Sequence, residues 1–298
     1  MVRMVLVYPL KIGALALIFW FLVRQRLPQT PAIVVAIVLA ILFHIAIAAW
    51  LTSRRRLADA RLLQNTLRGE VPRDGQRIAL AGTIEPEGET LRTPFGVVPC
   101  VLYSYEIYRM VQSRSSSSSS TSTTTRVTDF SGVALAPSVI RTSNGRFAIC
   151  GFPYLTDPVR ESGREPARLA NARDYIARSE FARTIPFAGE LAALDHAMMT
   201  TARSLRFDWQ MTDGDRIGEA TLQEEYVPPS TRMCALGVYS AADKGLVPGR
   251  GAEERIRLIA GEGPDVLQGL TGGARYSQVL TAVMVLIVAG ALSYILLR

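Results

Sequence analysis

Thiol and imidazole side chains are the first candidates for chemistry, and the sequence offers Cys100, His196 and His44 among them. Cys100 begins the run "CVLYSYEIYRMVQ", where a thiol could be a nucleophile, a metal ligand or a packed core group. A nucleophilic cysteine needs a histidine beside it, and only folding could bring His196 to it. We therefore expect Cys100 to be a buried structural thiol. The alternative is a membrane hydrolase or transferase that uses Cys100 or His196.

The other candidate groups favour structural roles. Asp195 and His196 are adjacent on an expected helix, so their side chains point in different directions and cannot form a catalytic dyad. His44 lies inside an apolar run, where packing against a neighbouring helix is a simpler explanation than a polar path. Cys150 and Cys234 lie in apolar strand patterns. We expect no catalytic, metal-binding or cofactor-binding residue.

Three apolar runs, 11–23, 32–51 and 277–297, predict membrane-spanning helices. The second and third contain no charge and reach the length of about 20 residues that a bilayer core requires. Lys11 interrupts the first run, which still crosses if Lys11 extends to the interface. No small-x-small cleavage site follows Val23, so a helical hairpin is expected rather than a signal peptide. The second helix is expected to continue out of the bilayer through "RRRLADARLLQ".

The net charge of +7 belongs to the ends of the chain. Outside 62–276 lie nine of the 33 basic residues and only Asp59 of the 26 acidic residues, which leaves 24 basic and 25 acidic residues in the middle. A nucleic-acid-binding domain would carry its own basic face, and this segment has no net excess. The basic residues after the second run, Arg54, Arg55, Arg56 and Arg61, predict a cytoplasmic central segment by the positive-inside rule.

The central segment predicts a β-rich α+β domain. Residues 77–86 and 100–112 alternate in the manner of strands, and 165–181 and 189–205 have helical spacing. The Ser/Thr-rich tract 113–126 offers no apolar surface and predicts a loop between two strands. The expected domains are a transmembrane hairpin (1–56), a soluble domain (57–276) and a C-terminal transmembrane helix (277–298). Further strands are expected in 126–137, 145–155, 217–229, 233–241 and 255–261.

Motif residues within 75–270 carry a family resemblance. They are Gly82 of "GTI", Pro94 and Gly96 of "LRTPFG", Pro99, Cys100 and Tyr103 of "PCVLY", and Gly237, which follows Glu225. The segment resembles the GIDE, or BAM (beside a membrane), domain family, known from mitochondrial membrane ubiquitin ligases of the MULAN type. The resemblance implies a β-rich domain lying against a bilayer, with membrane helices before and after it.

Ubiquitin ligase activity in that family depends on a zinc RING, which holds two zinc ions with four Cys or His ligands each. Three cysteines and two histidines cannot supply that set. The resemblance therefore implies a RING-less, prokaryotic-type relative in the bacterial inner membrane. We expect a non-catalytic scaffold that recruits a protein partner at the bilayer and uses no cofactor. An accessory subunit of a transporter is a further alternative.

Overall fold

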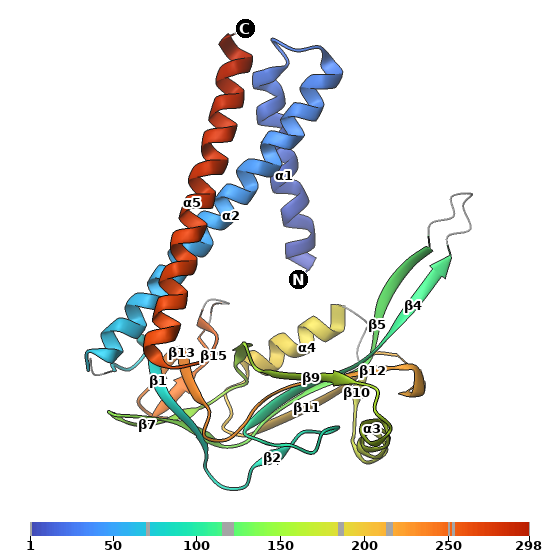
Figure 1. The fold of residues 1–298 in the computed structure, drawn as a ribbon, viewed down its shortest axis with the longest axis vertical. Coiled ribbons are helices and arrows are strands. Elements are labelled where there is room, and N and C mark those ends of the chain that lie inside the picture. The colour runs from blue at the N-terminus through green and yellow to red at the C-terminus, as the bar shows by residue number, and fades with distance from the viewer. Residues whose placement is uncertain are drawn as a thin grey trace. The chain divides into compact units, whose positions relative to one another are not determined.

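The computed structural model describes residues 2–69, 72–114, 122–183, 188–212, 217–249, 251 and 254–297 (Figure 1). The chain divides into two compact units. Unit 1 comprises Met1–Arg61 and Leu267–Arg298, and unit 2 comprises Leu62–Val266. The fold is α+β, with long helices in unit 1 and most of the strands in unit 2.

Unit 1 contains α1 (Val2–Val23) and parts of α2 (Gln29–Leu67) and α5 (Gly263–Leu297). In the described residues, α2 and α5 are the helices long and apolar enough to cross a membrane. The apolar stretch described for α1, Ile12–Val23, is shorter than a bilayer core requires. Two of the three expected spanning helices therefore have the length and composition to cross a membrane, and the third is only short.

The helices of unit 1 pack through small and apolar side chains. Phe19 of α1, Ala36 of α2 and Val288 of α5 are buried in one cluster. Alanines on α2 allow close approach of the backbones, as is typical of helices in a bilayer. Ser53 Oγ donates to the carbonyl oxygen of Ala274 at 3.1 Å, which joins α2 to α5. Both helices continue beyond the expected boundaries at 56 and 277, because each carries a polar helical extension.

The first sheet of unit 2 closes into a ring. The strands pair in the order β1–β6–β7–β14–β13, and β13 pairs again with β1. Beyond β13, the sheet continues through β15 to β8. The bounds are β1 Arg77–Pro86, β6 Ser138–Thr142, β7 Gly145–Ile149, β14 Gly245–Val247, β13 Arg232–Ser240, β15 Arg257–Ala260 and β8 Tyr154–Thr156.

The second sheet has helices on opposite faces (Figure 1). Its order is β10–β11–β5–β4–β12–β9, and α3 (Pro166–Arg178) and α4 (Ala188–Met199) cover its two faces. The bounds are β10 Ala182–Arg183, β11 Leu205–Gln210, β5 Ser122–Leu135, β4 Leu102–Arg114, β12 Thr221–Val227 and β9 Val159–Gly163. A short pair, β2 (Leu91–Arg92) with β3 (Pro99–Cys100), and a 3₁₀ turn, Ile217–Glu219, complete the unit.

The prediction that residues 113–126 form a loop is wrong at both ends of the tract, where the residues belong to strands. β4 runs to Arg114 and β5 begins at Ser122, and these two residues pair. The pairing continues through Thr124 and Thr125, since β-branched residues suit a strand. Arg126 adds a stack over the Tyr108 ring, 3.6 Å from its centroid. Residues 115–121, the middle of the tract, lie outside the described residues.

The strand and helix predictions in the domain were otherwise close. β1 has the predicted bounds, α3 lies within its predicted helical segment, and α4 begins one residue before its predicted segment. The second helix ends earlier than expected, because β11 begins at Leu205 and pairs with β5. Strands β2, β6, β9, β10, β11 and β14 were missed.

Candidate functional site

Cys100 is packed in a hydrophobic core. Strand β3, which contains it, pairs with β2, and the side chain has no exposed surface among Phe95, Tyr103 and Tyr226. Burial, with a smaller contribution from Glu224, raises the pKa of the Cys100 thiol to about 12. The thiol is therefore protonated at neutral pH, which is the opposite of an activated nucleophile. Cys150 and Cys234 are buried as well, as predicted.

The structure does not pair Cys100 with His196. His196 is exposed on α4, and its ring packs against Phe207, with 5.7 Å between centroids. The residues after it, Ala197 and Met198, join a different core cluster from the one that holds Cys100. The neighbouring Asp195 forms an ion pair with Arg255 rather than with the histidine. Cys100 and His196, the candidate nucleophile and base, thus lie in or next to different core clusters.

The described residues contain no group of three or more His, Cys, Asp or Glu side chains that could hold a metal ion. His44 is half-buried on α2 in unit 1.

The motif residues around "TPFG" surround a buried carboxylate that sequence reasoning missed. Glu224 of β12 has no exposed surface and accepts from the backbone N–H of Phe95 at 2.6 Å and of Gly96 at 3.0 Å. Arg168 of α3 donates to Glu224 at 2.8 Å. Burial raises the pKa of Glu224, while the two N–H groups and Arg168 favour its charged form. Glu224 thereby fixes the turn that leads into Cys100.

A second hydrogen-bond network lies on the same face of the sheet, beside a glycine. Gly132 of β5 lies between Tyr105 of β4 and Asp208 of β11. A Cβ at Gly132 would stand 2.6 Å from Oδ1 of Asp208 and 2.8 Å from Cζ of Tyr105. The absent side chain leaves a path along which the Tyr105 hydroxyl donates to Asp208 at 2.7 Å. Tyr175 of α3 donates to the same oxygen at 2.9 Å, which joins helix to sheet.

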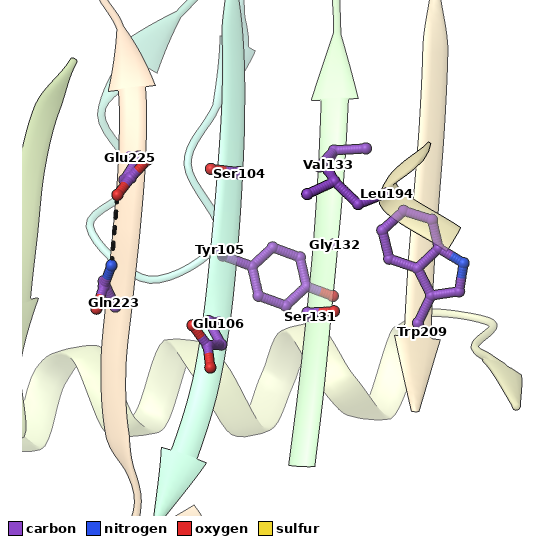
Figure 2. A pocket seen from close by; sticks show the side chains of 10 residues that line it. All are labelled: Ser104, Tyr105, Glu106, Ser131, Gly132, Val133, Leu194, Trp209, Gln223 and Glu225. Atoms are coloured by element: carbon purple, nitrogen blue, oxygen red, sulfur yellow. Dashed lines mark hydrogen bonds between the residues drawn. The ribbon is translucent and has the colours of Figure 1, made fainter. Parts of the chain in front are cut away.

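The opposite face of the sheet holds a half-open pocket of about 160 Å³ (Figure 2). Trp209 and Leu194 lie at one side, and Gln223 and Glu225 lie at the other. The lining residues are Ser104, Tyr105, Glu106, Ser131, Gly132, Val133, Leu194, Trp209, Gln223 and Glu225. The pocket therefore combines an aromatic wall with hydroxyl, amide and carboxylate groups, and it is smaller than the about 300–1,000 Å³ of usual small-molecule sites.

Both carboxylates of the pocket are already held by basic residues. Glu106 accepts from Thr128 at 2.6 Å and from Arg126 at 3.1 Å. Glu225 accepts from Arg160 at 2.8 Å. The described residues that line the pocket include no histidine, cysteine or lysine.

Two further residues of the resemblance motif, Gly82 and Gly237, lie where the backbone is closely surrounded. Gly82 lies where β1 passes from pairing with β13 to pairing with β6, against the backbone of Arg141. Gly237 lies in β13, where a Cβ would stand 3.3 Å from the Cβ of Leu246. Both positions leave little room for a side chain.

Comparisons of the chain with protein-family models, with curated proteins and with solved structures found no match. The family resemblance therefore rests on the motif residues alone.

Proposed function

We propose that the chain is a membrane-anchored scaffold whose β-rich unit binds a protein partner and performs no reaction of its own. The observation that carries the proposal is the state of Cys100. It is fully buried and its pKa is raised, while His196 is exposed beside Phe207. The alternative, a hydrolase or transferase that uses Cys100 or His196, is not favoured by the burial of the thiol or by the separation of the two side chains into different surroundings.

The membrane part of the proposal has three spanning helices, with α1 and α2 as a hairpin. Support for α2 and α5 comes from their length and composition. Support for α1 comes from its packing, since Phe19 and Val23 are buried against α2 and α5. Near the end of α1, Arg24 stacks over Trp20, 4.8 Å from the ring centroid, a pairing that suits the headgroup region.

The family part of the proposal is a RING-less GIDE/BAM-like domain. The motif supports it because its glycines lie at positions with a structural constraint. Gly82 lies where β1 changes its pairing partner from β13 to β6, and Gly96 lies on the turn whose N–H groups Glu224 binds. The chain lacks the ligands of a RING, so ubiquitin ligase activity is not part of the proposal.

The pocket is the proposed place of partner contact, and photo-crosslinking tests it. A photoreactive phenylalanine in place of Gln223, which lines the pocket, should give a discrete crosslinked protein in native membranes. The same residue in place of Arg178, on α3 and thus on the other face of the sheet, is the matched control and should give none. Equal crosslinking from both sites, or from neither, would contradict a partner at the pocket.

We place unit 2 in the cytoplasm of a bacterial cell, with the chain in the inner membrane. Arg54, Arg55 and Arg56 follow the second apolar run, whereas the hairpin turn holds only Arg24 and Arg26. By the positive-inside rule, the N-terminus lies inside and Arg298 outside. Alkaline phosphatase, which is active only outside, should be active when fused after Arg298 and silent when fused at Thr125. The reverse pattern would overturn the orientation.

A further inference from the structure

Basic side chains from α2 and α5 gather at one level of unit 1. Ser53 of α2 bonds to the carbonyl oxygen of Ala274 on α5. A Cβ at Gly273 would stand 3.1 Å from Cζ of Arg56, so this glycine leaves room for the Arg56 guanidinium across α5. These two contacts place Arg54 and Arg56 of α2 at the same level along the helices as Arg275 of α5.

The surroundings of these arginines are strongly basic. Unit 1 contains ten basic residues and one acidic residue, Asp59, which is buried. Arg54 and Arg275 are exposed. Asp59 and Arg55 each take part in an interaction, and the proposed site depends on neither of them. An anion would therefore meet a positive field with no exposed carboxylate of unit 1 beside it.

Aromatic and apolar residues stand next to the same arginines. Arg54 lies over the ring of Trp50, 4.9 Å from its centroid. Trp50 is 46% exposed and Tyr276 is 70% exposed. The apolar run of α2 ends at Leu51, and that of α5 continues from Tyr276 through the exposed Val279. Tryptophan and tyrosine of this kind mark the boundary between hydrocarbon and headgroups.

We propose that Arg54, Arg56 and Arg275 form a site for the phosphate group of anionic phospholipids in the bilayer. Guanidinium groups match phosphate oxygens in pairs, and basic residues beside a membrane attract anionic lipid. The lipid headgroup is the occupant because the arginines directly border exposed apolar surface of α2 and α5, which acyl chains cover in the proposed membrane placement. The inference rests on the proposed membrane placement of α2 and α5.

The test uses Trp50 as the reporter in the full chain. Trp20→Phe and Trp209→Phe leave Trp50 as the single tryptophan. The protein is reconstituted in phosphatidylcholine vesicles that contain equal small fractions of either brominated phosphatidylglycerol or brominated phosphatidylcholine, since bromine quenches tryptophan on contact. Brominated phosphatidylglycerol should quench Trp50 more strongly. Each Arg→Gln change at Arg54, Arg56 or Arg275 should weaken that preference about fivefold, and high salt should weaken it too.

The controls separate the site from the membrane placement. Arg24→Gln, at the hairpin turn, should leave the preference unchanged, and Arg54→Lys should retain part of it, because the charge remains while the paired guanidinium contacts are lost. Equal quenching by the two brominated lipids in the protein with native arginines would overturn the lipid site while supporting the membrane placement. Absence of quenching by either lipid would overturn both.

Discussion

Replacing Glu224 with glutamine is expected to lower the free energy of unfolding of unit 2 by about 3–5 kcal/mol, the usual cost of removing one partner from a buried ion pair. Glu224 is fully buried, and its carboxylate serves Arg168 and two backbone N–H groups. Glutamine would keep one acceptor, but its amide nitrogen would face a donor. Arg168 would also lose one of its two close carboxylates, the other being Glu161 at 2.6 Å.

Glu225→Gln is the matched control for this prediction. Glu225 is the next residue on the same strand and also pairs with one arginine, Arg160, whose side chain is 63% exposed. Exposed pairs contribute about 0.2–1 kcal/mol, so this change should be small. Urea unfolding of the full chain in detergent, followed by Trp209 fluorescence after Trp20→Phe and Trp50→Phe, measures both. Equal losses for the two variants would mean that Glu224 does not hold the turn.

Gly82→Ala is expected to destabilise unit 2 by about 3 kcal/mol, at the upper end of the usual cost of overpacking. The new Cβ would overlap the carbonyl oxygen of Arg141 and stand 2.8 Å from its carbonyl carbon. Both atoms belong to backbone, so no side chain can rotate away. The clash falls at the point where β1 leaves β13 and joins β6, and relief would require opening the ring of strands.

Gly218→Ala serves as the control for this second prediction. Gly218 lies in the 3₁₀ turn, and the nearest atom to its new Cβ would be Arg173 Nη2 at 3.5 Å, an ordinary contact. The midpoint of urea unfolding should shift strongly for Gly82→Ala and little for Gly218→Ala. A Gly82→Ala protein as stable as the unmodified chain would show that β1 and β6 are not closed as described.

Alternation of apolar residues was a good guide to the long strands. Strand β1 has the expected bounds, because Ile78, Leu80 and Ile84 are buried. The missed strands are mostly short or mixed in composition: β9 reads "VRESG" and β14 reads "GLV". Their place in a sheet depends on neighbours that are distant in the chain, such as β12 for β9. Tertiary pairing of this kind leaves little local pattern.

The buried carboxylate was missed for a related reason. A glutamate in a strand is normally taken to face solvent, since charged residues are rarely buried. A signal was present, because Glu224 lies two residues from Leu222 and two from Tyr226, and both are buried on the same face. Composition was also misleading at the Ser/Thr tract, where backbone pairing extends further than the lack of apolar side chains predicts.

The reactivity of Cys100 in the native protein tests most directly the claim that unit 2 binds without catalysing. Burial raises the pKa of the Cys100 thiol to about 12, so the thiol is almost entirely protonated at pH 8. Alkylation of the folded chain, followed by mass spectrometry of the Cys100 peptide, should therefore be far slower than for the chain unfolded in denaturant. Rapid alkylation of the folded protein, half-maximal near neutral pH, would identify an activated thiolate. That result would contradict the scaffold and favour the hydrolase or transferase.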